Sequence, residues 1–388
     1  MNYVWLDCDP VRLCHHLVHF DQRRRQGHDD ATAILLALHS TNIRLLGVST
    51  VRRCLCNTSC TILAQGYFLK VHGNTAAENT KVNAARCLHA FAAPGHVKVY
   101  PGAAAPLLRP ARHDSEIHGP GGLGGVEGLP LADSEAVRAR IDDSLPAVEA
   151  MAAAIGRTWN AGEGVKVTVV ATGPLTNVAL FVSVYPRLLS VAVERIVFMG
   201  GGIGVGNRSA VAEFNILCDP EAAQIVLNAT VPKTMIPLNV THKAIVTDSI
   251  HNKLLNPTSH EAHPGVASSP LRQMLSTLVH FVREKYKLIF GFMDGPPLHD
   301  ALTIGYVSHP ELFIGRRHRV DVELAGTHTS GETVADVWGY LKSDDTWGRT
   351  GRNCEVATDL DVTAFFDLLL GCVARCDEVS PLNLGTKN

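Results

Sequence analysis

The feature that most constrains the fold is a regular alternation of short apolar runs with longer stretches of helical periodicity. Short apolar runs bounded by turn residues indicate buried strands, and the segments between them are long enough to cross over between parallel strands. Strands are expected at residues 3–6, 43–49, 97–100, 166–171, 195–199 and 234–237, and helices at 31–39, 79–91, 145–159, 175–184 and 220–228. This order predicts an α/β fold with one open, mostly parallel, doubly wound (Rossmann-like) sheet in a single domain over residues 1–388. The site is expected at the carboxyl ends of its strands.

Charge and hydropathy indicate which classes of binding partner the sequence does not favour. The chain has 35 Lys and Arg against 37 Asp and Glu, a net charge of −2, so nothing favours nucleic acid or a membrane surface. No apolar run approaches the ~18 residues that span a bilayer. The start, MNYVWLDCDP, lacks the features of a signal peptide. The 10 Cys are therefore expected to be reduced thiols in a cytoplasmic protein, with a homo-oligomer left open.

Two segments, residues 11–26 and 51–70, interrupt this pattern. Each lies in a strand-to-helix connection that ordinarily takes only a few residues. Each begins with Val, whose codons start with GT, and they end in Gln and Lys, whose codons can end in AG. Because introns have these ends, we interpret both segments as retained introns or atypical insertions. Cys54, Cys56 and Cys60 in the second segment match no usual zinc spacing.

Acidic residues crowd the first strand-to-helix turn. Asp7 and Asp9 end the first expected strand, and Asp29 and Asp30 precede the first expected helix. One such Asp is explained as a helix cap, but four around one turn repel one another unless a cation lies among them. Carboxylates in this position suit a hard ion such as Ca²⁺, which takes 6–8 oxygen ligands.

A glycine-rich run, VFMGGGIGVGNRSAVAEFN, follows the expected strand at 195–199. A dinucleotide loop is the rival interpretation, but the G-x-G-x-x-G spacing fails: counted from Gly202, its last position is Asn207. Asn207, Glu213 and Asn215 carry polar groups able to hold sugar hydroxyls, although a polar loop before a helix explains them as well.

Two further motifs place polar residues before expected helices. In ATGPLTN, Thr172 ends a strand, where turn chemistry alone could explain it. In GPPLHDALTIGY, His299 and Asp300 precede an apolar helix. A lone His is more often structural than catalytic, so this pair gains weight only within a larger constellation.

Together these motifs resemble the inosine/uridine-preferring nucleoside hydrolase family, and most closely its fungal uridine-type members. The resemblance runs from about residue 3 to about residue 313 and excludes both interruptions. It is carried by six motifs in order: DCDP…GHDDA, HGN, ATGPLTN, MGGG…GN…AEFN…DPEAA, PLNVTHKA and GPPLHD. It implies the nucleoside hydrolase fold, a ribonucleoside substrate and Ca²⁺ as cofactor.

The resemblance also implies a role for each matching residue. Asp9, Asp30, Asp300 and the main-chain carbonyl of Thr172 would bind Ca²⁺, and Asp9 would be the general base. His299 would be the leaving-group acid. The substrate-binding residues would be Asp29, Asn74, His118, Asn207, Glu213 and Asn215. Tyr286 and Phe290 are candidates for stacking on the base, against the alternative that both only pack on the core.

Three classes of function follow. The first is a hydrolase that cleaves the N-glycosidic bond of uridine, inosine and related ribonucleosides, with water activated by Asp9. The second is an inactive metal- or nucleoside-binding homologue, with its site disrupted by the insertions at 11–26 and 51–70. The third is a nucleotide-dependent oxidoreductase, against which the failed glycine spacing and the acidic cluster both count. The motif order favours the first.

Overall fold

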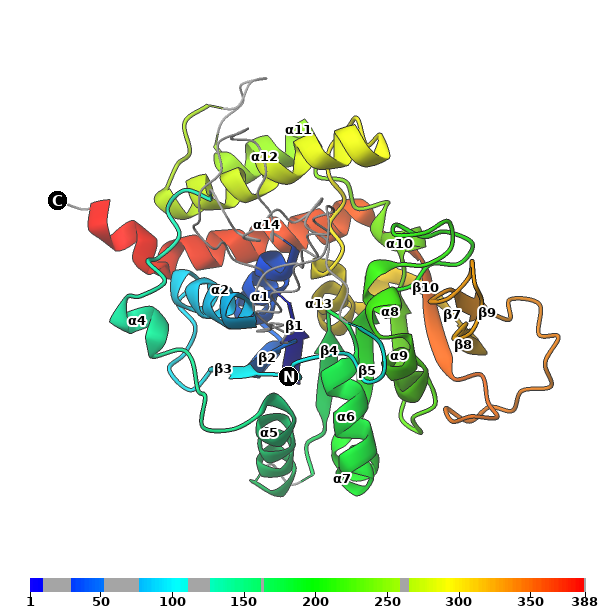
Figure 1. The fold of residues 1–388 in the computed structure, drawn as a ribbon. Coiled ribbons are helices and arrows are strands. Elements are labelled where there is room, and N and C mark those ends of the chain that lie inside the picture. The colour runs from blue at the N-terminus through cyan, green and yellow to red at the C-terminus, as the bar shows by residue number, and fades with distance from the viewer. Residues whose placement is uncertain (10–28, 52–76, 111–125, 162–163, 259–264, 387–388) are drawn as a thin grey trace, which may run out of the picture.

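A computed structural model describes residues 1–9, 29–51, 77–110, 126–161, 164–258 and 265–386. Its centre is an eight-stranded sheet in the order β3-β2-β1-β4-β5-β6-β10-β7, parallel except for β7, which runs antiparallel to β10 (Figure 1). A separate pair, β8 and β9, is antiparallel. The strands are β1 (Asn2–Cys8), β2 (Ile43–Thr50), β3 (Val99–Pro101), β4 (Val167–Ala171), β5 (Val193–Met199), β6 (Lys233–Ile236), β7 (Phe313–His318), β8 (Val320–Val322), β9 (Thr333–Ala335) and β10 (Cys354–Leu360).

Helices cover both faces of the large sheet. One face is covered by α1 (Asp29–His39), α2 (Ala77–Ala90), α13 (Ala301–Ser308) and α14 (Val362–Val379). Helices α11 (Asp248–Leu255) and α12 (Pro270–Phe290) pack on each other and on α14, further from the sheet. The other face packs against α5 (Ala147–Ala161), α6 (Thr176–Val184), α7 (Pro186–Ala192) and α9 (Pro220–Leu227). Short helices complete the chain: α4 (Glu135–Arg138), α8 (Phe214–Cys218), α10 (Leu238–Thr241), η1 (Pro310–Leu312) and η2 (Pro381–Thr386). The predicted α/β doubly wound class is confirmed.

The strand order places a topological switch point beside β1. From β1 the chain winds outward through β2 and β3, then returns to add β4, β5 and β6 on the other side. Leu6 of β1 therefore lies between Val48 of β2 and Val170 of β4. Ligands of open α/β sheets bind in the crevice where the winding direction reverses, so the loops after β1 and β4 are where a site is expected.

All six predicted strands and all five predicted helices exist, with boundaries shifted by a few residues. Helix α1 begins at Asp29 rather than at residue 31, because both acids belong to its first turn. Strand β6 ends at Ile236, one residue early, because Pro237 caps α10. The elements after residue 313, from β7 to α14, were not predicted.

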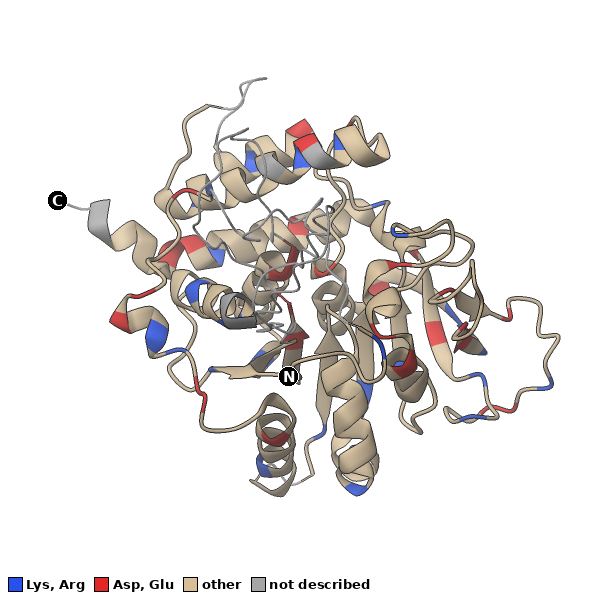
Figure 2. Ribbon diagram, in the orientation of Figure 1, with Lys and Arg blue, Asp and Glu red and all other residues tan. Residues whose placement is uncertain are grey.

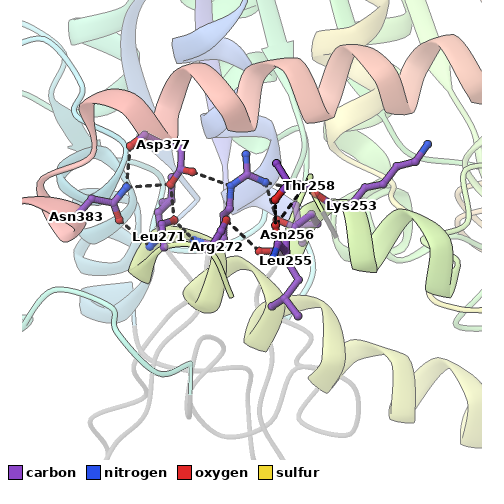
Figure 3. A network of polar contacts seen from close by, with 11 residues as sticks. Lys253, Leu255, Asn256, Thr258, Leu271, Arg272, Asp377 and Asn383 are labelled. Carbon is purple, nitrogen blue, oxygen red and sulfur yellow. Dashed lines mark hydrogen bonds and ion pairs between the residues drawn. The ribbon is translucent and has the colours of Figure 1, made fainter. Parts of the chain in front are cut away.

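A buried polar network fixes the start of α12 (Figure 3). Arg272 is 3% exposed and donates from Nε to Oδ2 of Asp377 on α14, at 2.7 Å. Its Nη1 donates to the carbonyl of Leu254 on α11, also at 2.7 Å. Asn383 accepts from the amide of Leu271 at 3.1 Å. Because removing one partner of a buried ion pair leaves a charge uncompensated, this network ties three helices firmly together.

The two interrupting segments lie outside the described residues, apart from Val51. Val51 is buried, and its amide donates to the carbonyl of Cys8 at 3.1 Å, so it extends the pairing of β2 with β1. The interpretation of the segments as retained introns stays a prediction. Within the described part of the chain, six cysteines are buried free thiols, and no helix is long and apolar enough to cross a membrane.

Candidate active site

The carboxyl ends of β1 and β4 meet at Asp30, in the first turn of α1. Oδ1 of Asp30 accepts from the main-chain amide of Asp9 at 3.2 Å and from Oγ1 of Thr172 at 2.9 Å. The amide of Thr172 donates in turn to the carbonyl of Asp7 at 2.9 Å. Three segments that are separate in the sequence are therefore held together at the switch point, where Figure 2 shows acidic segments around β1 and α1.

Gly173, in the loop after β4, leaves room for the side chain of Asp9. A Cβ atom added to Gly173 would lie 3.0 Å from Oδ1 of Asp9 and 3.1 Å from its Cγ. Contacts this short are tighter than side chains normally tolerate, so the absence of a side chain at residue 173 is what leaves room for the Asp9 carboxyl group.

Asp29 and Asp300 complete an acidic cluster. Burial raises the pKa of Asp29 to about 7, although a hydrogen bond from the main-chain amide of His299 opposes the rise. Burial also raises the pKa of Asp30, and the charge of Asp9 adds to it. The pKa of Asp300 is raised well above its usual range by burial and then by the charges of Asp30, Asp29 and Asp9. The four carboxyl groups predicted to converge therefore do so.

The donor chemistry of this cluster fits a hard cation. Asp9, Asp30 and Asp300 offer carboxyl oxygens, and buried acids that repel one another either hold protons or pair with positive charge. The carbonyl of Thr172 accepts from Nδ2 of Asn215 at 2.9 Å, and its second lone pair remains. In the described residues, however, no three His, Cys, Asp or Glu side chains are grouped as a metal-binding set.

Asp7 lies beneath the cluster and is fully buried. Its Oδ1 accepts from Ser49 Oγ at 2.6 Å and from Asn177 Nδ2 at 2.8 Å, whereas no described residue bonds its buried Oδ2. Burial raises the pKa of Asp7 to about 7. The hydrogen bonds from Ser49 and Asn177 oppose this rise, and the charge of Asp9 adds a smaller increase. Asp7 thus joins β1 to β2 and α6 directly below the loop that carries Asp9.

The glycine-rich loop after β5 is folded around Glu213. Both carboxyl oxygens of Glu213 accept main-chain amides, from Gly201 at 2.9 Å, Asn215 at 2.9 Å and Ile216 at 3.2 Å. Burial raises the pKa of Glu213, and these amides oppose the rise. The amide of Gly201 thus donates to a carboxylate of the protein itself. In a dinucleotide-binding loop, such amides would instead be available to a phosphate.

Asn207 and Asn215 each make hydrogen bonds around this loop through only one of the two polar atoms of the side-chain amide. Oδ1 of Asn207 accepts from the amide of Phe214 at 2.9 Å. Nδ2 of Asn215 bonds the carbonyls of Thr172 and Met199. Their other ends, Nδ2 of Asn207 and Oδ1 of Asn215, make no hydrogen bond to described residues and can serve a ligand.

His299 is buried between two hydroxyl groups. Its Nε2 lies 2.7 Å from Oη of Tyr286, and its Nδ1 lies 2.7 Å from Oγ1 of Thr241. Tyr286 sits near the end of α12 and Thr241 ends α10, so the tautomer of His299 depends on two separate elements. A hydroxyl can donate or accept, so this arrangement can pass a proton without moving the ring.

Aromatic rings surround His299. Tyr286 packs against Phe290 at a centroid distance of 5.3 Å and against Phe292 at 5.7 Å, and His242 lies 5.6 Å from His299. Tyr286 is thus not only a core residue, because its hydroxyl reaches the candidate acid. Thr241, His242 and Phe292 were missed from the sequence, although the motif PLNVTHKA contains the first two.

Arg208 was also missed, although it directly follows Asn207. Its guanidinium lies 5.5 Å from the Phe214 ring, and burial lowers its pKa, whereas the charges of Tyr286 and Glu213 oppose this. It is a cation close to the acidic side chains. Asn74 and His118, the other predicted substrate residues, lie outside the described residues.

Comparison with known proteins identifies the family of this chain. Residues 68–367 match the family described as inosine-uridine preferring nucleoside hydrolase. A probable ribonucleoside hydrolase of Dictyostelium discoideum is 34% identical over 353 residues, which cover 90% of this chain and 92% of that protein. The pyrimidine-specific ribonucleoside hydrolase RihA of Shewanella woodyi is 34% identical, over 94% of this chain and 96% of that protein.

Solved structures share the fold. A purine-preferring ribonucleoside hydrolase from Gardnerella vaginalis superposes with a TM-score of 0.73 at 23% identity, covering 98% of this chain and 100% of that one. An inosine-guanosine nucleoside hydrolase has a TM-score of 0.74 at 23% identity, covering 96% of this chain and 99% of that one.

Proposed function

This chain belongs to the inosine-uridine preferring nucleoside hydrolase family, and we propose that it cleaves ribonucleosides into free base and ribose at the acidic cluster around Asp30. The observation that carries the proposal is the convergence of Asp9, Asp29, Asp30 and Asp300 at the switch point of the sheet. Cleavage of a glycosidic bond passes through a state with positive charge on the sugar ring, which buried carboxylates stabilise.

Asp9 is the proposed general base. Its carboxyl group lies against Gly173, and its main-chain amide bonds Asp30, so its backbone is fixed while the side chain can accept a proton from water. Asp9, Asp30, Asp300 and the Thr172 carbonyl are the oxygens that would hold Ca²⁺. When bound, the cation supplies positive charge that lowers the pKa of water and attracts the ribose hydroxyls.

His299 is the proposed acid for the departing base. With Thr241 holding Nδ1, a protonated His299 can donate from Nε2 to the Tyr286 hydroxyl as that hydroxyl gives its own proton to the base, which leaves His299 neutral and Tyr286 unchanged. Tyr286, Phe290 and Phe292 provide aromatic surface for a nucleobase.

The sugar is the proposed target of the remaining polar groups. Asp29, Oδ1 of Asn215 and Nδ2 of Asn207 would bind the hydroxyls, together with Glu213, Asn74 and His118. A site built to bind hydroxyl groups rejects a substrate that lacks one by up to about 10⁴-fold, so deoxyribonucleosides should be poor substrates. The RihA relative is named as pyrimidine-specific, and we propose uridine as well as inosine as substrates in cytoplasmic nucleoside catabolism.

Release of reducing sugar from uridine, inosine and 2′-deoxyuridine tests the proposal. We expect ribose from both ribonucleosides, little release from deoxyuridine, loss of activity in a chelator and recovery with added Ca²⁺. Release that survives the chelator would contradict the role of the cation. No release from any ribonucleoside would leave the homologue inactive and contradict the proposed function.

A further inference from the structure

A cleft of about 510 Å³ opens at the amino ends of the parallel strands, whereas the acidic cluster lies at their carboxyl ends. Figure 1 shows the N-terminus of the chain at this end of the sheet, with α12 beyond the opposite end. We call it the amino-end cleft. Its polar lining includes Asn2, Lys166, Thr168, Arg195, Tyr306 and Ser308. Its volume falls within the range of roughly 300–1,000 Å³ that small-molecule sites have.

The register of the sheet brings a hydroxyl and two cations together in this cleft. Thr168 of β4 pairs with Arg195 of β5 in the parallel register. Because side chains alternate along a strand, Lys166, two residues before Thr168, is directed to the same face of the sheet. Helix α13 packs on β4 and β5, and its last residue, Ser308, also lines the cleft. The three side chains therefore gather beside the end of α13.

Arg195 is partly buried and keeps most of its hydrogen-bond donors for a ligand. Its Nη1 donates to Oη of Tyr306 at 3.4 Å, and this hydroxyl donates to Oε2 of Glu355 at 2.9 Å. Among the described residues, no carboxylate forms an ion pair with Arg195 or Lys166. A guanidinium has five N–H donors, and their fork geometry matches the oxygens of a phosphate group.

The hydroxyl of Thr168 lacks a protein partner in the part of the chain that the structure describes. Thr168 is 6% exposed and belongs to the lining of the cleft. The large majority of buried polar side-chain atoms have a hydrogen-bond partner. An oxygen of a ligand in the cleft would supply the partner of Thr168, next to the guanidinium of Arg195.

Amide donors cover the end of α13 where the cleft meets it. Nδ2 of Asn2 donates to the carbonyl of Val307 at 3.1 Å, and Nδ2 of Asn42 donates to the carbonyl of Ser308 at 2.7 Å. The carbonyls at the end of a helix carry partial negative charge, which would repel an anion. Because these two carbonyls are already bonded, the helix end opposes an anion in the cleft only weakly.

The charge of the lining favours an anion. Lys166 and Arg195 face one acidic residue of the lining, Glu194. Glu194 precedes Arg195 along β5, so it is directed to the opposite face of the sheet, and it is exposed to water that screens its charge. A phosphate group carries nearly two negative charges and three acceptor oxygens, which match two cations and a hydroxyl better than a carboxylate does.

We propose that the amino-end cleft binds a small phosphate monoester, with its phosphate group held by Lys166, Thr168 and Arg195. A phosphate group alone fills only a small part of 510 Å³, so the organic part of the ligand occupies the rest. The site lies at the other end of the strands from the acidic cluster, so it stands or falls independently of the proposed hydrolysis.

Isothermal titration calorimetry of the full chain with inorganic phosphate and with uridine 5′-monophosphate tests the site. We expect both to bind, the monoester more tightly. Lys166→Gln/Arg195→Gln should weaken both by more than about tenfold, and Thr168→Val, which keeps the shape of the side chain, by about tenfold. The matched control is Arg187→Gln/Lys342→Gln, which removes an exposed Arg and an exposed Lys elsewhere and should bind as the wild type does.

A second control separates this cleft from the acidic cluster. Asp300→Asn should bind both ligands as the wild type does, and the variants in the cleft should keep the wild-type rate on uridine. Circular dichroism and thermal unfolding show that each variant is folded. A wild type that binds neither ligand at millimolar concentration would overturn the proposal. So would a Lys166→Gln/Arg195→Gln variant with wild-type affinity, an equal loss in the Arg187→Gln/Lys342→Gln control, or a loss in Asp300→Asn. A monoester that binds no more tightly than inorganic phosphate would overturn it too, because the rest of the cleft would then contribute nothing.

Discussion

The main-chain amide of Asp9 donates to Oδ1 of Asp30 over 3.2 Å, so the end of β1 is tied directly to the first turn of α1. Thr172 donates to the same oxygen at 2.9 Å. Asp30 therefore fixes the backbone at Asp9, whereas the Asp9 carboxyl group itself is placed by the free space at Gly173.

Gly173→Ala is expected to reduce turnover without unfolding the protein. Its new methyl group would lie 3.0 Å from Oδ1 of Asp9 and displace the carboxyl group. Misplacing a catalytic group by about 1 Å costs a factor of about 10² in rate. Gly156→Ala on α5 is the control, since no atom lies within 4 Å of its added Cβ. It should keep full activity and gain about 0.5–1 kcal/mol in the free energy of unfolding. Equal activity of the two variants would show that Gly173 does not place Asp9.

Cation binding is expected to depend on pH. Burial raises the pKa of Asp29 from 3.8 to about 7, and those of Asp30 and Asp300 rise in the same direction. Groups with raised folded pKa values stabilise the metal-free protein below their unfolded pKa, and this stability is lost as pH rises through the folded pKa. In the metal-free protein, the contribution of the cluster to the free energy of unfolding should therefore decrease as the pH rises from about 4 to about 7.

A cation must displace the protons that these acids hold. The rise in Tm on adding Ca²⁺ should therefore be larger at about pH 8 than at about pH 5. Asp300→Asn should lose most of the rise, and Asp133→Asn, at an exposed acid, should keep it. A rise that is equal at both pH values, or unaffected by Asp300→Asn, would contradict binding at this cluster.

His299→Ala should impair natural nucleosides more than a riboside with an activated leaving group such as p-nitrophenol. A good leaving group departs without protonation, so it does not need the acid. We expect a loss of about 10²–10⁴-fold in kcat on uridine and a much smaller loss on the activated substrate. The exposed His96→Ala is the control. Equal losses on both substrates would mean that His299 positions the base instead of protonating it.

Deleting residues 11–26 and 52–70 should raise both activity and Ca²⁺ affinity. With the first segment removed, Pro10 meets Gly27, and a short connection joins Asp9 to Asp30. Ordering a longer loop costs about 1–2 kcal/mol for each residue fixed. Val51 is kept because its amide bonds Cys8. Calcium titration and the uridine rate compare the trimmed and full chains, and a less active trimmed chain would refute the retained-intron interpretation.

The sequence predicted the first six strands because each contains a short apolar run, most of which is buried in the structure except in the short edge strand β3. It missed β7 and β10, whose sequences FIGRRH and CEVATDL mix polar and apolar residues. β7 is an edge strand on which Ile314 is 62% exposed. Its order of apolar and polar residues therefore does not match the order of buried and exposed positions from which a strand is predicted.

The acidic cluster was predictable because its members adjoin strand and helix ends in the sequence. The surroundings of His299 were not, because Thr241 and Tyr286 reach it from α10 and α12, and only tertiary packing brings these together. Glu213 illustrates a different gap. Its carboxyl group caps α8 and holds the glycine loop, roles that depend on the loop conformation and that the sequence did not predict, whereas its binding of sugar stays a prediction.

The most direct test of the account is the rate of ribose release from uridine by Asp9→Asn, compared with the wild type and with the exposed control Asp133→Asn. The amide keeps the shape of the Asp9 side chain but cannot accept the proton of water. We expect a fall of about 10²–10⁴-fold in kcat, with circular dichroism and Tm showing an intact fold. The control should retain full activity. Wild-type turnover by Asp9→Asn would contradict the assignment of Asp9 as the general base and the mechanism built on it.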